Sequence, residues 1–368
     1  MWLQTELTNC LLEIVYVTFF LNFSNQNLTV RVMTFSSLGL SKIFRHQEAV
    51  ILAITLSIFG FFSVFLEGFF VVGNLLTLLR SVSVLGILSV AMAIVVISRG
   101  IDLSLIGTLV VATALAVILK SPNALFSAGL SFNWAFLVGV VFVIITSSLT
   151  GVLITFGNLP AVFVSLAMGS VIYGLGLTFF INTDANYLPD DANWVVFLGS
   201  GRLFGIPMPI FCFVFLLITF SFVLNRTAFG QFLYAIGDNT EAARTAGIPV
   251  RPVTVLIYVF AGLIAYMAGL LTAGAVTNIN TKLFQSTLIY DVLLVVVVGG
   301  IGLSGGKGGM RNVLLGTVLI GTLLNGMVIL NMSFIEQNLV KGVILLFAIM
   351  IDTLLNPRDE QTSQQGDI

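Results

Sequence analysis

The sequence predicts an all-α membrane protein, a polytopic helical bundle with about ten transmembrane helices, several of them broken. The first observation is composition: hydrophobic residues make up 58% of the 368 residues and charged residues only 8%. Soluble chains carry roughly a quarter of charged residues, so this chain cannot cover a soluble surface. The second is a mean hydropathy of +1.10. The third is the length of the apolar runs, which repeatedly reach about 20 residues, enough to cross a bilayer.

The transmembrane helices are predicted from apolar runs that short polar or glycine-rich segments separate. Several runs contain glycines at spacings that suit close helix packing, namely Gly169, Gly174, Gly176, Gly316 and Gly321. The predicted spans are residues 48–71, 80–99, 103–120, 134–156, 159–182, 207–225, 252–276, 285–303, 313–331 and 339–356.

Three segments break these spans. Asn158 and Pro160 lie between the fourth and fifth spans, residues 100–104 (GIDLS) lie between the second and third, and residues 299–309 end the eighth. The last two segments resemble each other, since VISRGIDLS precedes the third span and VVGGIGLS ends the eighth. Paired glycine-interrupted segments in two halves of a chain are typical of the internal repeat of a transporter.

The distribution of lysine and arginine predicts that both termini are cytoplasmic, because cytoplasmic loops carry the excess of basic residues. The predicted organisation is an N-terminal cytoplasmic segment (1–47), a transmembrane domain (48–356) and a disordered cytoplasmic tail (357–368). Basic residues assigned to the inner side are Arg31, Lys42, Arg45, Arg99, Arg226, Arg244, Arg251, Lys307, Arg311 and Arg358. Those assigned to the outer side are Arg80, Lys120, Arg202, Lys282 and Lys341.

Residues 226–252, here called the elbow, form the longest polar passage between two apolar runs and are predicted to fold into short helices on the cytoplasmic side. Asp238 and Glu241 have the spacing of a capping box. Residues 242–246 favour helix, Gly247 supplies a left-handed stop, and Pro249 prevents continuation. A helix this short is marginal alone, so we expect it to rest on another part of the chain or on a partner. An ordinary connecting loop is the alternative.

Ionisable residues at or inside the spans are candidates for function, because buried charge is costly in a membrane. Asp102 is expected to cap the following helix through backbone N–H groups. Asp291 lies early in the eighth span, with Lys282 or Tyr290 as its possible partner. The residues predicted for the translocation path or gate are Asp102, Ser104, Asn158 and Asp291.

Several classes of function find no support in the sequence. The net charge of −1 leaves no basic footprint for nucleic acid, and one histidine with two separated cysteines builds no metal site. LSGGKGG at 303–309 is not a phosphate-binding loop, because Gly308 follows Lys307 and Ile301 stands where the first glycine should be. A tight inner-side turn is the simpler interpretation. We therefore predict no catalytic residue, no metal and no cofactor of the chain's own.

Three groups of residues occur in the order and at the ordinary spacing of one known family. Near the second span these are Asn74, Leu75, Leu76, Arg80, Gly86, Ile87, Leu88 and residues 100–104. In the elbow they are Gly230, Tyr234, Ala235, Gly237, Asn239, Glu241, Ala242, Ala243, Arg244, Gly247 and Ile248. Late in the chain they are Asp291, Gly299, Gly300, residues 303–306 and Gly308. On these motifs, residues 74–352 resemble the permease subunits of bacterial ABC importers for simple sugars.

The resemblance implies a role in sugar import at the bacterial inner membrane, by alternating access. It implies a cytoplasmic ABC ATPase that binds the ATP, a periplasmic sugar-binding protein, and a second permease copy or a sister permease. The permease itself would not hydrolyse ATP. The family's coupling loop maps onto Asp238, Glu241, Ala242, Ala243, Arg244 and Gly247.

The sequence departs from the family's usual pattern at several positions. Arg99 stands where glycine is common, and Gly174 stands where an arginine often follows the tyrosine. One alternative is therefore an ABC permease for another solute, such as a branched-chain amino acid, a nucleoside or a furanose-like signal. Another is an ion-coupled carrier without an ATPase. A third is a membrane enzyme acting on a lipid-linked sugar, whose candidate residues are Asp184, Asp190 and Asp191.

Overall fold

The computed structural model describes residues 47–119, 131–181 and 183–355, which belong to one compact unit of the chain. The predicted N-terminal segment, 1–47, lies outside the described residues except for Gln47, the first residue of helix α2. The predicted tail, 357–368, also lies outside them. The division into segment, transmembrane domain and tail therefore stays a prediction.

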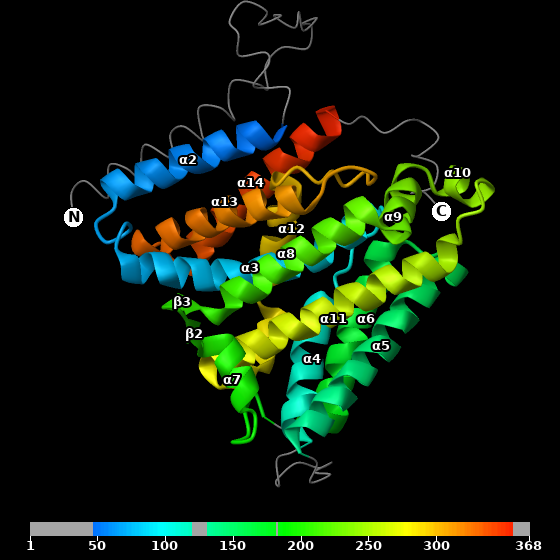
Figure 1. The fold of residues 1–368 in the computed structure, drawn as a ribbon, viewed down its shortest axis with the longest axis horizontal. Coiled ribbons are helices and arrows are strands. Elements are labelled where there is room, and N and C mark those ends of the chain that lie inside the picture. The colour runs from blue at the N-terminus through cyan, green and yellow to red at the C-terminus, as the bar shows by residue number, and fades with distance from the viewer. Residues whose placement is uncertain (1–46, 120–130, 182, 356–368) are drawn as a thin grey trace, which may run out of the picture. The chain divides into compact units, whose positions relative to one another are not determined.

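Helices dominate the described secondary structure (Figure 1), as the sequence predicts. They are α2 Gln47–Phe65, α3 Val72–Ile97, α4 Leu105–Ile118, α5 Phe132–Gly157, α6 Ala161–Leu175, α7 Asn193–Ser200, α8 Met208–Arg226, α9 Ala228–Asp238, α10 Thr240–Thr245, α11 Val250–Val276, α12 Leu288–Val298, α13 Met310–Ile329 and α14 Phe334–Leu355. A π-helical turn, Gly176–Phe180, continues α6, and a 3-10 helix, Thr281–Gln285, precedes α12. Two short antiparallel pairs join β1 Ala185–Tyr187 with β4 Asn278–Asn280, and β2 Arg202–Leu203 with β3 Ile206–Pro207.

Seven of the described helices are long and apolar enough to cross a membrane: α2, α3, α5, α6 with its π-helical turn, α8, α11 and α13. Two further apolar helices, α4 and α12, have only 14 and 11 residues. At 1.5 Å per residue they rise about 21 Å and about 17 Å, less than the roughly 30 Å of a hydrocarbon core. The chain is thus a polytopic helical membrane protein, and the count of ten spans stays a prediction.

Helix α3 lies at the centre of the packing. In its most apolar 18-residue window 83% of the residues are buried, compared with 17% for α2. Figure 1 shows α3 between α8 and α13, and it also packs against α11 and α12. A helix that is apolar on every side is typical of such a buried position. Helix α2 instead exposes apolar side chains such as Leu56 and Phe65, which suit contact with lipid.

Close helix crossings occur at four of the five glycines for which the sequence predicts them, Gly169, Gly176, Gly316 and Gly321. A Cβ added to Gly169 would lie 3.2 Å from the Cα of Ser104, where α6 crosses the start of α4. The prediction is wrong for Gly174, because a Cβ there would meet no atom within 4 Å and the residue is exposed. Glycine spacing marks a helix face, and it does not say whether another helix covers that face.

Polar side chains join distant parts of the bundle. The Nη2 atom of Arg80 donates hydrogen bonds to the carbonyl oxygens of Gly199 and Ala275, both at 3.1 Å. These carbonyls lie in the last turns of α7 and α11, where backbone acceptors lack intrahelical partners and carry partial negative charge. Asn74 and Asn325 exchange two amide hydrogen bonds, at 2.9 Å and 3.1 Å, between α3 and α13. Both contacts fix α3 to helices that follow much later in the chain.

Candidate functional site

The elbow is the first part of the candidate site, and it consists of α9 and α10 between the ends of α8 and α11 (Figure 1). Thr227 caps the start of α9, and its hydroxyl accepts the N–H of Gly230 at 3.3 Å. The chain after α10 turns at a left-handed Gly247, with φ of 84°. The N–H groups of Gly247 and Ile248 donate to Arg244 and Ala243, at 3.1 Å and 3.0 Å. This Schellman stop confirms the predicted role of Gly247.

The predicted helix cap is one residue out of place. Asp238 is the last residue of α9, and the cap of α10 is Asn239, whose side chain accepts the N–H of Ala242 at 3.0 Å. Glu241 therefore does not complete a capping box. It forms an ion pair with Arg244 at 2.9 Å along the same helix. Asp and Asn cap helices about equally well, so sequence alone could not choose between neighbours.

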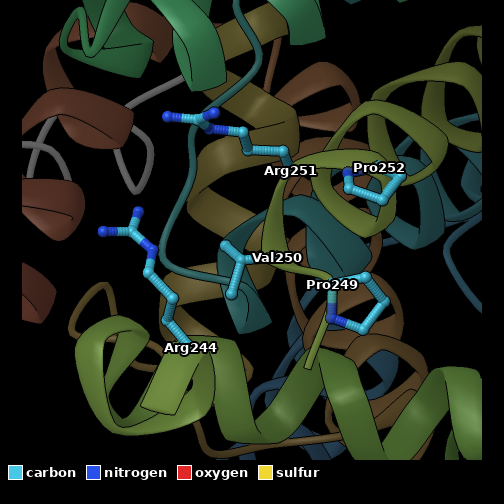
Figure 2. A pocket seen from close by; sticks show the side chains of 5 residues that line it. All are labelled: Arg244, Pro249, Val250, Arg251 and Pro252. Atoms are coloured by element: carbon cyan, nitrogen blue, oxygen red, sulfur yellow. The ribbon is translucent and has the colours of Figure 1, made fainter. Parts of the chain in front are cut away.

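Helix α10 has one buried and one charged face. Ala243 is 4% exposed and packs into the hydrophobic core, whereas the side chains of Glu241 and Arg244 are 58% and 52% exposed. A pocket beside α10 is lined by Arg244 and residues 249–252. Figure 2 shows that the side chains of Arg244 and Arg251 extend toward the same side. The guanidinium carbon of Arg251 also lies 4.9 Å from the ring centre of Phe156 on α5, within range of a cation–π contact.

Replacing Asn239 with alanine is expected to destabilise α10 by about 1 kcal/mol, because the first turn loses its side-chain acceptor. Amide hydrogen exchange of residues 242–246 should then be roughly fivefold faster. Asp238→Ala is the matched control, since Asp238 does not cap α10. A larger effect of Asp238→Ala than of Asn239→Ala would restore the cap that the sequence predicts.

The elbow rests against two helix breaks, one after α3 and one in residues 299–309, here called the glycine loop. Gly237 packs so closely that an added Cβ would overlap the carbonyl oxygen of Ile97, the last residue of α3, and would lie 2.6 Å from the nitrogen of Gly306. The hydroxyl of Tyr234 donates to the carbonyl of Gly308 at 2.7 Å. Burial raises the pKa of Tyr234, so this hydroxyl remains a donor at neutral pH. The elbow and the glycine loop therefore form one packed unit.

The two helix breaks end their helices in the same way. Arg99 after α3 and Gly300 after α12 are both left-handed, with φ of 70° and 90°. The two N–H groups after each helix close the same pair of backbone hydrogen bonds, which is the Schellman motif. Helices α10 and α13 also end in this way, at Gly247 and Asn331, so the predicted repeat stays a prediction. The paired bonds, 2.9–3.1 Å long, run from Arg99 to Val96, Gly100 to Val95, Gly300 to Val297 and Ile301 to Val296.

Asp102 and Ser104 form a buried turn before α4. They are 2% and 3% exposed, and one carboxylate oxygen of Asp102 accepts the N–H and the hydroxyl of Ser104, at 2.9 Å and 2.5 Å. Helix α4 begins at Leu105, so the carboxylate orders the residue before the helix and does not cap the helix itself. The expected helix cap is therefore wrong, and the carboxylate accepts the backbone N–H of Ser104 instead. The hydroxyl of Ser165 on α6 donates to the carbonyl of Ile101 in the same turn, at 3.0 Å.

Asp291 has a partner that sequence analysis missed. Its carboxylate lies 2.8 Å from the ammonium of Lys341 on α14, and both side chains are nearly buried. The predicted partners are wrong, because Lys282 pairs instead with Asp184 at 2.7 Å. The ammonium of Lys341 also donates to the hydroxyl of Thr287 at 3.1 Å. Asp291 and Lys341 are fifty positions apart in the sequence, and no local pattern joins residues on separate helices.

Asn158, the remaining candidate for the path or gate, is the exposed, left-handed residue that ends α5, with φ of 50°. Its conformation explains the break between α5 and α6, because asparagine tolerates this region better than most residues. Within the described residues, no hydrogen bond or ion pair joins Asn158, Asp102 and Asp291. The four predicted path residues therefore lie in three separate structural contexts.

The acidic loop that suggested an enzyme has local structural partners. Asp184 forms its ion pair with Lys282 beside β1 and β4, and a carboxylate oxygen of Asp191 accepts the N–H of Phe132 at 3.1 Å. Across the described residues, no three His, Cys, Asp or Glu side chains gather as metal ligands would. These contacts give Asp184 and Asp191 structural partners.

The comparison with known proteins agrees with the resemblance found in the sequence. The family described as the permease component of the branched-chain amino acid transport system matches residues 74–351. A probable ABC transporter permease of Escherichia coli strain K12 is 33% identical over 323 residues, covering 87% of this chain and 94% of the relative. The ribose import permease of Bacillus subtilis strain 168 is 33% identical over 279 residues, covering 76% of this chain and 84% of the relative.

A third relative is more distant. The fructose import permease of Rhizobium meliloti is 28% identical over 309 residues, covering 82% of this chain and 83% of the relative. No solved structure matches the chain. The family match spans the helix breaks, the elbow, the glycine loop and the Asp291–Lys341 pair. The chain therefore belongs to the family of membrane-embedded permease components described for the branched-chain amino acid transport system.

Proposed function

We propose that the chain is the permease subunit of an ATP-binding-cassette importer in a bacterial inner membrane, and that it moves a monosaccharide from the periplasm to the cytoplasm. The proposal is supported by relatives named as ribose, fructose and L-arabinose permeases. The substrate path runs through the helical bundle, and a periplasmic sugar-binding protein delivers the sugar. A second copy of the chain, or a sister permease, completes the path.

The elbow is the proposed docking site for the ATPase, which binds the ATP and supplies the energy. The observation that carries this proposal is the form of α10, a short helix with an exposed Glu241–Arg244 pair and a buried Ala243. Such a helix offers a charged face to the groove of a partner while its other face stays fixed to the bundle. Asp238, Ala242 and Gly247 complete the docking segment.

The way in which the elbow is attached supports alternating access. Gly237 packs against the end of α3, and Tyr234 bonds the glycine loop before α13. A displacement of α10 by the ATPase would therefore move the ends of α3 and α12 together with it. Because packed elements shift as units and do not deform continuously, this attachment favours a movement between two arrangements of the bundle.

Reversing one charge on α10 tests the docking site. Glu241→Lys is expected to reduce the ATPase recovered with the tagged chain from detergent-solubilised membranes by about tenfold, or about 1.4 kcal/mol, because a groove that receives the carboxylate of Glu241 is not complementary to an ammonium group. Recovery is measured as the amount of ATPase subunit per permease. Equal recovery with the variant and the wild-type chain would refute docking at α10.

Two controls separate docking from folding. Glu67→Lys reverses an exposed charge between α2 and α3, away from the elbow, and should leave recovery unchanged. Glu241→Gln removes the Arg244 pair without adding a cation, and such an exposed pair contributes only about 0–1 kcal/mol to stability. A loss of ATPase with Glu67→Lys would point to general damage by charge reversal.

The alternatives are separated by uptake in vesicles. Vesicles holding the complete importer are tested with D-ribose, D-fructose and L-arabinose against leucine and adenosine, which represent the branched-chain amino acids and the nucleosides. An ion-coupled carrier would take up its solute in vesicles that hold this chain alone. Uptake that requires ATP and the partner subunits supports the importer.

A further inference from the structure

Arg99 occupies a backbone position that favours glycine. It is the left-handed residue after α3, with φ of 70°, and the equivalent residue after α12 is Gly300. A Cβ atom makes this conformation unfavourable, and such residues persist where the surrounding structure determines them. Glycine would end α3 with less strain, so we expect contacts of the arginine side chain that offset this strain.

The side chain of Arg99 binds two segments that are far apart in the sequence. Its Nε atom donates to the carbonyl oxygen of Ser304 in the glycine loop at 2.8 Å. Its Nη2 atom donates to the carbonyl oxygen of Asp238 at 2.8 Å. Asp238 is the last residue of α9, where free carbonyl oxygens carry partial negative charge and attract a cation. One guanidinium group thus joins the elbow, the glycine loop and the end of α3.

Backbone contacts place the same three segments within reach of one another. The N–H of Gly306 donates to the carbonyl oxygen of Ile97 at 2.8 Å, and Gly237 packs on that same oxygen. These contacts hold the glycine loop and the elbow against α3 without any side chain. Arg99 adds charge-assisted bonds across the junction, which are stronger than bonds between neutral groups.

The geometry of the guanidinium group suits this role. Two of its nitrogens reach two carbonyl oxygens in different segments, and the plane of the group fixes their relative directions. Lysine would bring the same charge but only a single nitrogen at the end of a flexible chain. Arg99→Lys therefore keeps the charge and the left-handed backbone strain, but it loses the planar group whose two nitrogens bind two carbonyl oxygens.

We propose that Arg99 is a positioning residue that couples movement of the elbow to the ends of α3 and α12. This proposal rests on the proposed function, because in that function the ATPase is the partner that moves the elbow. At the equivalent position after α12, Gly300 forms the same stop without a side-chain bond. Of these two positions, the one after α3 therefore carries the added side-chain link.

The first experiment measures the link in the full-length chain in detergent and needs no partner. Arg99→Gly should speed amide hydrogen exchange in residues 237–246 and 302–306 about fivefold or more, the lower end of usual coupling strengths. Exchange in α5 should stay unchanged, and the thermal midpoint should change little, because relief of the left-handed strain offsets the loss of the two side-chain bonds. Arg99→Lys should also speed exchange at the elbow. Unchanged exchange at the elbow with both variants would overturn the proposal.

The second experiment measures sugar taken up per ATP hydrolysed in vesicles holding the complete importer, with D-ribose, D-fructose and L-arabinose as probes. Arg99→Gly should lower this ratio about fivefold or more, while ATPase recovery and basal hydrolysis stay near wild type. A purely structural role would instead lower hydrolysis and uptake together and leave their ratio unchanged, which would overturn the proposal. If the wild-type chain shows no ATP-dependent uptake, the proposed function fails, and the exchange experiment still decides whether Arg99 links the elbow to the breaks.

Discussion

Replacing Gly237 with alanine is expected to loosen the elbow from the bundle and to destabilise the protein by about 3 kcal/mol, at the upper end of the cost of overpacking. The added Cβ would overlap the carbonyl oxygen of Ile97 and crowd the nitrogen of Gly306. Both atoms belong to the backbone and bond each other at 2.8 Å, so no side-chain rotation relieves the contact. Thermal unfolding in detergent measures the loss, and amide exchange in α9 and α10 locates it.

Gly174→Ala is the matched control. This glycine also lies inside a helix, but an added Cβ would meet no atom within 4 Å. The alanine should leave stability unchanged or raise it by up to about 1 kcal/mol, because glycine is the poorer helix former. Equal stability of Gly237→Ala and the wild-type chain would mean that the elbow does not rest on the end of α3, and the proposed transmission from α10 would lose its basis.

The fold class was predictable because one physical constraint dominates it. In a bilayer every backbone polar group must be bonded inside the protein, and an apolar run of about 20 residues does this within itself as a helix. The same length rule overestimated α4 and α12, whose apolar runs continue through breaks that are not helical. Glycines predicted the places of these breaks. The backbone conformation of each break depends on a left-handed residue, and at the break after α3 that residue is Arg99.

The candidate site was predictable only where its contacts are local. Gly247 ends α10 as expected, because a left-handed glycine acts within one turn of helix. The predicted capping residue of α10 was wrong by one position, since Asp238 and Asn239 offer nearly equal acceptors. Contacts between distant segments, such as Tyr234 with Gly308, leave no periodic pattern in the sequence. Arg99 was noticed as a departure from the family, and the structure supplies two bonds that explain it.

Replacing Lys341 with methionine is expected to destabilise the protein by about 3–5 kcal/mol, because it leaves the carboxylate of Asp291 buried without its counter-ion. The two side chains are only 9% and 12% exposed, and they join α12 to α14. Thermal unfolding in detergent measures the effect. Lys282→Met is the matched control, since it breaks an ion pair whose members are 65% and 59% exposed. Such a surface pair contributes only about 0–1 kcal/mol.

The double variant Asp291→Asn, Lys341→Met separates the charge from the packing. If the cost of Lys341→Met arises from an uncompensated carboxylate, removing that charge should recover most of the lost stability, as apolar or neutral replacements of buried pairs generally do. If the double variant is as unstable as the single one, the ammonium acts mainly through Thr287, which it also bonds at 3.1 Å. A Lys341→Met variant no less stable than Lys282→Met would place Asp291 in contact with water, and the contact between α12 and α14 would then not depend on the ion pair.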